Sequence, residues 1–270
     1  MPQPVLLITG AAGNFGRKLS AHFRSKGFEL VLLDVAVESD SDVADLSRWG
    51  DWHERFAGVD CVIHLAADRR VEASWASVIP NNIDATLNVF EAASRHSVRR
   101  VVFASSVWVM RGSADVPASV SEDLTPMPVN AYGASKVAGE RIGRFFSETR
   151  GLSVICLRSG AVLPGPDNRP GKFLGSVAWE QRIWLSDRDL CRAFELAVSA
   201  PDTMRFEIFN VVSDNDGMRW DMSKAERLLG FRPEDSSVPV APRLSRRVVQ
   251  RLKKMLGLWR QPDTGPPLTG

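Results

Sequence analysis

Short apolar runs alternate with amphipathic stretches through most of the chain. Residues 5–9 and 29–34 are apolar runs of strand length, and the segment 15–26 between them places its apolar residues at helical spacing. The alternation continues with expected strands at 61–66, 101–104 and 154–157 and expected helices at 79–96 and 132–150. Buried parallel strands joined by helices form doubly wound sheets. The pattern therefore predicts an α/β fold, a Rossmann-type doubly wound parallel sheet.

The alternation weakens at residues 164–171, a stretch with three prolines and two glycines. Beyond it we expect a helix near 187–199, a strand at 206–211 and a helix at 223–229 that Gly230 ends. The predicted organisation is a Rossmann domain, a small C-terminal substrate lobe interleaved with it, and a basic tail, over residues 1–163, 164–240 and 241–270.

Composition narrows the class of protein. With 270 residues, of which 44% are hydrophobic and 24% charged, the chain suits one large globular domain with a small addition. It lacks a signal-peptide pattern and an apolar run of membrane-spanning length, so we expect a cytoplasmic protein without an integral membrane segment. Cys61, Cys156 and Cys191 lie in apolar segments and are expected as buried thiols. The four histidines show no ligand spacing, and no metal is expected.

Positive charge gathers in the tail, where residues 241–270 carry seven arginines and lysines against one aspartate, although the net charge of the chain is only +2. Residues 244–259 could form a basic amphipathic helix, which would suit a membrane surface, a nucleic acid or an acidic partner. The alternative is a C-terminal helix docked on its own domain with a solvated basic face. We prefer this alternative, and predict no nucleic-acid partner.

A glycine-rich turn joins the first expected strand to the first expected helix. Gly10, Gly13 and Gly16 recur at three-residue spacing. Glycine allows a tight turn and a close backbone approach, so that the helix N-terminus can face a pyrophosphate. Asp34 ends the second strand, where a carboxylate can accept hydrogen bonds from ribose hydroxyls and would repel a 2′-phosphate. NAD is therefore favoured over NADP as the cofactor.

Tyr132, the only tyrosine of the chain, stands four residues before Lys136. On a helix the two side chains share a face, so the lysine charge could lower the tyrosine pKa toward working pH. A phenolate formed in this way could act as a general base. The alternative is that the spacing is accidental.

These features occur in the order typical of one superfamily. The glycine turn, Asp34, Asp45-Leu46, the strand end at 64–67, Asn82, Ser105-Ser106 and the Tyr132/Lys136 pair all follow that order. The chain resembles the extended short-chain dehydrogenase/reductase superfamily, in its NAD-dependent epimerase/dehydratase branch, over roughly residues 4–235. Within it, local similarities at 103–106, 184–189, 213–217 and 229–233 look closest to the uronate-dehydrogenase-like proteins.

The resemblance implies roles for individual residues. Ser106, Tyr132 and Lys136 would be catalytic, with Ser105 as the competing serine, and Ser106, Val107, Trp108 and Tyr132 would meet the substrate. The residues expected to bind or support NAD are Gly10, Gly13, Asn14, Phe15, Gly16, Asp34, Asp45, Leu46, Leu65, Ala66, Ala67, Asn82, Tyr132 and Lys136.

The chain departs from the uronate dehydrogenases next to the serine. Those proteins follow it with an Asn-His pair that reaches the substrate, whereas this chain has Val107 and Trp108, so hydrogen bonds to a sugar acid are lost. Arg169 and Arg182 are candidates for binding a carboxylate. An apolar pocket wall is the other expectation, formed by Trp108 with Trp75, Trp179 and Met110, although tryptophans often simply belong to the core.

The implied chemistry is hydride transfer between NAD and a secondary or lactol hydroxyl. The short second lobe favours a small sugar, sugar acid or related alcohol as the substrate of a dehydrogenase. The alternatives are an NAD-retaining nucleotide-sugar 4-epimerase/dehydratase, and a regulator that binds the cofactor without turnover, which an intact catalytic set disfavours. By analogy with the superfamily we also expect a homodimer that pairs through the helices at 82–96 and 132–150.

Overall fold

The computed structural model of the chain describes residues 4–36, 41–113, 119–165 and 182–237. Residues 1–238 form one compact unit, and residues 239–270 form a second that lies outside the described residues. The predicted basic tail, Arg169 and Trp179 therefore lie outside the described residues as well.

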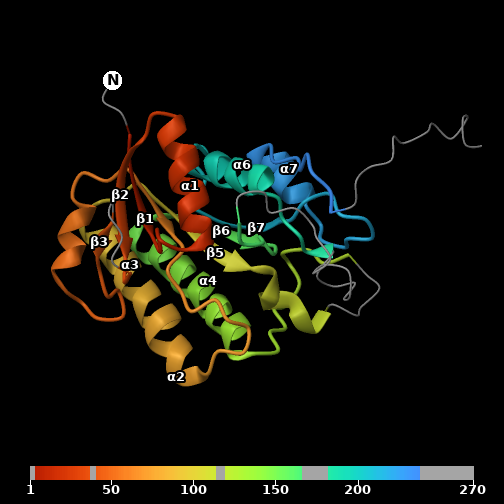
Figure 1. Ribbon diagram of the computed structural model, residues 1–270, viewed down its shortest axis with the longest axis horizontal. Coiled ribbons are helices and arrows are strands. Elements are labelled where there is room, and N and C mark those ends of the chain that lie inside the picture. The colour runs from red at the N-terminus through yellow and green to blue at the C-terminus, as the bar shows by residue number, and fades with distance from the viewer. Residues whose placement is uncertain (1–3, 37–40, 114–118, 166–181, 238–270) are drawn as a thin grey trace, which may run out of the picture. The chain divides into compact units, whose positions relative to one another are not determined.

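One all-parallel sheet of seven strands organises the described chain (Figure 1). Its order is β3-β2-β1-β4-β5-β6-β7, so the direction in which strands are added reverses between β1 and β4. This is the doubly wound Rossmann arrangement, and it confirms the predicted fold class. The strands are β1 (Val5–Thr9), β2 (Glu29–Asp34), β3 (Asp42–Val43), β4 (Cys61–His64), β5 (Arg100–Ser106), β6 (Ser153–Ser159) and β7 (Phe206–Val211).

Helices cover both faces of the sheet (Figure 1). One face packs against α1 (Asn14–Ser25), α6 (Asp187–Val198) and α7 (Ser223–Leu229), and the other against α3 (Ala85–Arg95) and α4 (Ala131–Arg150). Alternate residues of a strand point to opposite faces. In β5, accordingly, Val101 and Phe103 belong to the core under α3 and α4, whereas Val102 and Ala104 belong to the core under α1 and α6.

The expected helix 79–96 is two elements, the π-helix η2 (Ile79–Asp84) and α3, and the short helix α2 (Trp75–Val78) directly precedes them. Pro80 stands at the start of η2, where it lacks the N–H of a regular helical ladder. The remaining short elements are the 3₁₀ helices η1 (Asp51–Phe56) and η3 (Val107–Ser113).

The described residues that follow the predicted boundary at 163/164 pack onto the same sheet. β7 pairs with β6, with Leu157 opposite Phe209, and α6 and α7 cover its face. The separation into a Rossmann domain and an interleaved substrate lobe therefore remains a prediction. Cys61 and Cys156 are buried, as expected, whereas Cys191 is only partly buried.

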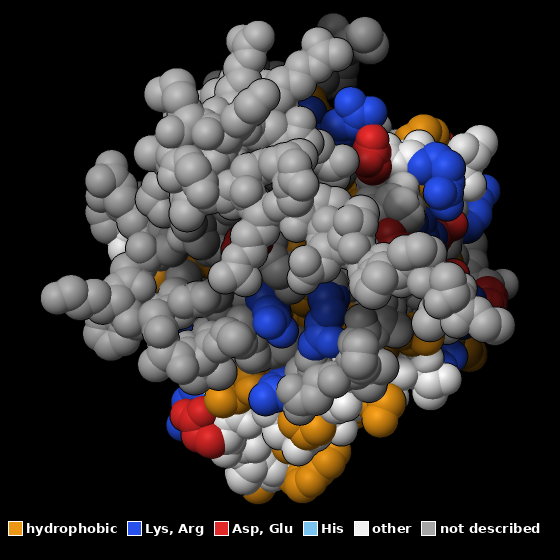
Figure 2. Space-filling view, turned by 90° about the vertical axis from the view of Figure 1, so that its right-hand side faces the viewer, with side chains coloured by type: hydrophobic (Ala, Val, Ile, Leu, Met, Phe, Trp, Pro, Cys, Tyr) orange, Lys and Arg blue, Asp and Glu red, His pale blue; other side chains and the backbone are white. Residues whose placement is uncertain are grey.

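The surface drawn in Figure 2 carries hydrophobic side chains at its lower edge and arginine and lysine side chains above them. Among the described residues, no helix has the length and apolar character needed to cross a membrane.

Candidate active site

Parallel strands bring their carboxyl ends to one edge of the sheet, and a cleft of about 880 Å³ opens there. The ends of β1, β2, β4, β5 and β6 line it, together with the first turn of α4. Among the predicted site residues, those that line the cleft are Gly10, Gly13, Asn14, Phe15, Gly16, Asp34, Asp45, Leu46, Leu65, Ala66, Ala67, Ser106, Val107, Trp108, Tyr132 and Lys136.

The glycine turn is tightly packed at the N-terminus of α1. Gly10 has a φ of +70°, and a Cβ there would lie 2.7 Å from the backbone nitrogen of Ala66. A Cβ on Gly16 would overlap the carbonyl oxygens of Gly10 and Ala11. The turn is closed by a 3.0 Å hydrogen bond from the Gly13 N–H to the Gly10 carbonyl. The turn therefore has no room for side chains at these positions and presents backbone N–H groups instead. Such a turn fits the pyrophosphate of a dinucleotide.

Asp34 braces this turn as well as facing the cleft. Its Oδ2 accepts a hydrogen bond of 2.9 Å from the Ala12 N–H, and its Oδ1 accepts one of 2.9 Å from the Ala36 N–H. Each carboxylate oxygen can accept a further hydrogen bond. A ribose with free hydroxyls therefore fits beside Asp34.

Asn82 differs from the other predicted cofactor residues because it lies beneath the cleft instead of lining it. It is 2% exposed, and its Oδ1 accepts from the Asp68 N–H at 2.7 Å. Its Nδ2 donates to the Asp68 carbonyl at 3.1 Å and to Ser135 Oγ at 2.9 Å. Asn82 therefore joins the loop after β4 to the first turn of α4.

The two adjacent serines at the end of β5 have different partners. Ser105 Oγ donates a 2.6 Å hydrogen bond to Glu140, which is buried in a two-bond ion pair with Arg158. Ser106, in contrast, lies beside Tyr132, whose pKa its hydroxyl acts to lower, and its Oγ accepts from the Trp108 N–H at 3.2 Å. Of the two serines, Ser106 is the one whose side chain acts on the predicted catalytic tyrosine.

Tyr132 and Lys136 lie in the first turns of α4. The helix begins after Asn130, whose side-chain oxygen accepts from the Gly133 N–H at 2.7 Å. Gly139 lets the helix approach β5 closely, because a Cβ there would overlap the ring of Phe103. The Lys136 ammonium lies 4.9 Å from the centre of that ring and 5.9 Å from the centre of the Tyr132 ring.

Burial dominates the electrostatics of this pair. It lowers the pKa of Lys136 to about 8. It also raises the pKa of Tyr132 above its usual value of 10.0, against the opposing effects of the Ser106 hydroxyl and the Arg69 charge. Lys136 is not among the causes of this shift, so the structure does not show the expected lowering of the tyrosine pKa by the lysine charge.

Several candidate pocket residues do not line the cleft. Met110 is fully buried in the core and Trp75 is exposed, and of the three proposed wall residues that the structure describes only Trp108 lines the cleft. Arg182 does not line it either.

Sequence reasoning missed other cleft residues. The loop after β4 contributes Asp68, Arg69 and Arg70, and the end of β6 contributes residues 159–162. The rule that parallel strands end at one edge could have indicated the end of β6. Arg70 pairs with Asp68, whereas Arg69 is exposed near Tyr132.

Comparison with known proteins agrees with this geometry. The model of the NAD dependent epimerase/dehydratase family matches residues 6–211. The chain belongs to this family. A member named NAD-dependent glucose-6-phosphate dehydrogenase, from Haloferax volcanii, is 34% identical over 265 residues, which cover 88% of this chain and 95% of that protein.

Further relatives include a uronate dehydrogenase from Pseudomonas syringae pv. tomato, 32% identical over 239 residues, which cover 86% of this chain and 82% of the relative. Among solved structures, a mutated uronate dehydrogenase superposes with a TM-score of 0.74 at 29% identity, covering 87% of this chain and 83% of the other. A glucuronic acid dehydrogenase from Chromohalobacter salexigens gives a TM-score of 0.74 at 26% identity, covering 93% and 90%.

Proposed function

We propose that this protein is an NAD-dependent oxidoreductase that transfers hydride between NAD and a small sugar, sugar acid or related alcohol. The observation that carries the proposal is that Ser106, Tyr132 and Lys136 line the same cleft as the glycine turn, with the serine hydroxyl beside the tyrosine. The chain is similar over most of its length to dehydrogenases named for glucose 6-phosphate, L-arabinose and uronate, which supports a sugar-like substrate.

The proposed cofactor site runs along the cleft. The glycine turn, with Asn14 and Phe15, would hold the pyrophosphate, and Asp34 the adenosine ribose. Asp45 and Leu46 would lie beside the adenine, and Lys136 would bind the nicotinamide ribose. Leu65, Ala66 and Ala67 would line the path between them. Asn82 would act indirectly, by holding the loop after β4 against α4.

In the proposed reaction Ser106 and Tyr132 hydrogen-bond the same substrate hydroxyl. Tyr132 in its phenolate form accepts the hydroxyl proton while the carbon–oxygen bond becomes a carbonyl. Oxidised NAD supplies the acceptor for the hydride that leaves this carbon, together with a positive charge that favours the phenolate. Arg69 adds positive charge near the phenol, which opposes the effect of burial on its pKa.

The substrate end of the proposed site has Val107 and Trp108 where the uronate dehydrogenases are expected to have an Asn-His pair, so it is less polar. Val107 is 1% exposed, and Trp108 offers an indole and a backbone N–H that already donates to Ser106. Polar recognition of the substrate would therefore fall to other cleft residues, of which Arg69 carries a charge next to Tyr132.

A homodimer and a cytoplasmic location are part of the same proposal. Leu87 on α3 and Phe145 on α4 are 46% and 53% exposed, which suits pairing of these two helices with a second copy.

Assaying purified protein for bound NAD and for net reduction of added NAD tests the proposed function. Nicotinamide absorbance is followed with a panel of sugars, sugar acids, sugar phosphates and alcohols. Net NADH formation with at least one of them is expected. An NAD-retaining epimerase or dehydratase would instead hold its cofactor tightly and give no net reduction, and that result would overturn the proposal.

A further inference from the structure

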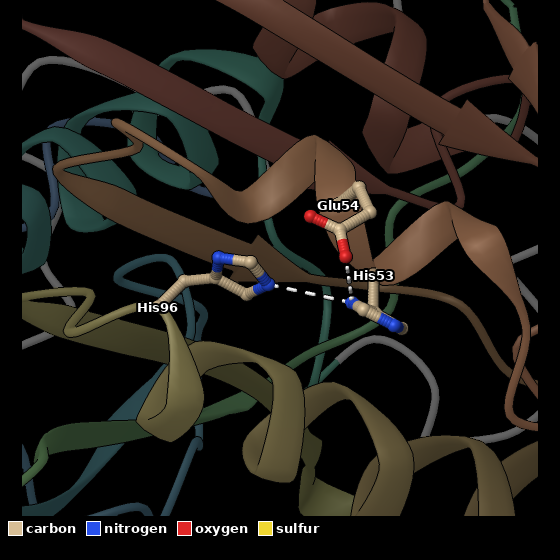
Figure 3. Close-up of side chains that lie close together, drawn as sticks. All are labelled: His53, Glu54 and His96. Carbon is tan, nitrogen blue, oxygen red and sulfur yellow. Dashed lines mark hydrogen bonds and ion pairs between the residues drawn. The ribbon is translucent and has the colours of Figure 1, made fainter.

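Three potential metal ligands converge on the surface outside the cleft (Figure 3). His53 and Glu54 lie in η1, and His96 follows the last residue of α3. His53 Nδ1 lies 3.4 Å from His96 Nε2 and 3.5 Å from Glu54 Oε1. The three ligand atoms all lie within 4.8 Å of one another.

These separations suit a tetrahedral zinc ion. Zinc binds histidine nitrogen and carboxylate oxygen at about 2.0–2.2 Å, and at tetrahedral angles this places neighbouring ligand atoms about 3.4 Å apart. The two contacts of His53 match that spacing. Glu54 is 69% exposed along its side chain, so it can adjust its distance from His96 without displacing packed neighbours.

Hydrogen bonds alone do not account well for the two close contacts of His53 Nδ1. His53 Nδ1 faces both an imidazole nitrogen and a carboxylate oxygen, and a single ring nitrogen has either one hydrogen or one lone pair to offer. If His53 Nδ1 accepts a hydrogen from His96, its lone pair faces the carboxylate oxygen. A cation between the three atoms would satisfy all of them at once.

Aromatic packing holds His53 in place. The His53 ring stacks on Trp49 with 4.7 Å between ring centres, and Arg95 covers Trp49 at 4.6 Å from its ring centre. The charge of Arg95, next to His96, is paired with Glu91. The His53 ring is therefore positioned by contacts that do not involve a metal.

We propose that His53, Glu54 and His96 bind one Zn²⁺ ion, with water as its fourth ligand. The ion would join η1 to the end of α3. The Asn88 side chain of α3 already donates a 2.9 Å hydrogen bond to the Leu46 carbonyl, so the metal would reinforce contacts between α3 and the segment leading to η1. The site is separate from the cleft and does not depend on the proposed oxidoreductase function.

Zinc titration of the full-length, tag-free chain by calorimetry tests the proposal. We expect one ion per chain and a rise in the thermal midpoint that excess EDTA reverses. H96A and E54Q should each weaken zinc binding by at least about tenfold. Loss of a ligand should cost at least as much affinity as loss of a residue that only hydrogen-bonds to a ligand. E54Q alters an exposed side chain, so its circular dichroism should match that of the wild type.

The matched control is H22A. It removes a histidine of α1 whose Nε2 lies 2.8 Å from Glu195 Oε2. It should bind zinc as the wild type does. Absence of stoichiometric zinc binding would overturn the proposal, as would unchanged binding in both H96A and E54Q, because zinc would then be bound elsewhere.

Discussion

Ser105 donates a hydrogen bond of 2.6 Å to Glu140, and this contact distinguishes it from the adjacent Ser106. Glu140 also binds Arg158 through hydrogen bonds of 2.8 and 2.9 Å, and all three side chains are buried. Ser105 is therefore hydrogen-bonded to a buried ion pair. Ser106, on the opposite face of the strand end, lies beside Tyr132.

Substituting the two serines separately should give opposite results. Ser106→Ala should lower kcat/KM by about a hundredfold or more, because a group that holds the reacting oxygen is lost, and should leave the thermal midpoint nearly unchanged. Ser105→Ala should cost about 1–2 kcal/mol of stability, because Glu140 loses a buried donor, and should keep most of the activity. Steady-state kinetics and urea unfolding of the two variants measure this. The reverse pattern would assign the catalytic role to Ser105.

Lys136 should reduce the stability of the protein at neutral pH. Its pKa is about 8 in the folded chain against an ordinary value of 10.5, so the unfolded state binds more protons. Burial of Lys136 therefore does not lower the free energy of unfolding above pH 10.5, and lowers it increasingly as the pH falls from 10.5 through 8. At pH 7 this loss of stability is on the order of 3 kcal/mol. Lys136→Met should therefore unfold at higher urea concentration while losing activity. Lys26→Met is the exposed control, and a Lys136→Met variant that is less stable at pH 7 would contradict the account.

His64 should make the protein sensitive to acid. The ring is fully buried between Thr9 Oγ1, 2.7 Å from Nδ1, and Thr86 Oγ1, 3.1 Å from Nε2, and burial lowers its pKa to about 3 from 6.5. The unfolded state takes up a proton first, so stability is lost progressively as the pH falls from 6.5 toward 3, by up to about 4–5 kcal/mol.

Asparagine at this position does not titrate. His64→Asn should be less stable at pH 7 but should show a weaker dependence of the urea midpoint on pH below 6.5. An unchanged pH dependence would mean that other groups cause the acid sensitivity.

Asp34 should determine the choice between NAD and NADP. Asp34→Asn keeps an acceptor oxygen for one of the two backbone N–H groups that it binds, but removes the charge that repels a 2′-phosphate. Loss of a charged hydrogen bond and of that repulsion should reduce the preference for NAD by about tenfold or more. The ratio of kcat/KM for the two cofactors measures it. An unchanged ratio would assign discrimination to another residue.

Most of the sheet could be predicted from the sequence, because buried parallel strands are apolar throughout. The ranges 5–9, 29–34 and 206–211 agree with β1, β2 and β7. β5 extends beyond its predicted start because Arg100 is buried, with its guanidinium donating to carbonyl groups at the end of α6, such as those of Ala197 and Val198. Because Arg100 is charged, the apolar pattern of the sequence does not include it in the strand.

Other features depend on contacts between distant residues. Asp42 and Val43 form β3 with exposed side chains, so no apolar run marks this strand. The choice between Ser105 and Ser106 rests on Glu140, which lies in a different element. His53 and His96 lie 43 positions apart and meet only because η1 packs beside α3, so their spacing gives no metal-binding motif.

In the proposed reaction, Tyr132 transfers the proton during hydride transfer to NAD. The most direct test of this step is NADH formation by Tyr132→Phe under saturating substrate, with NAD binding measured in parallel by fluorescence titration. We expect a loss of about 10²–10⁴-fold in kcat, with NAD binding close to that of the wild type. Near-normal turnover by Tyr132→Phe would contradict it.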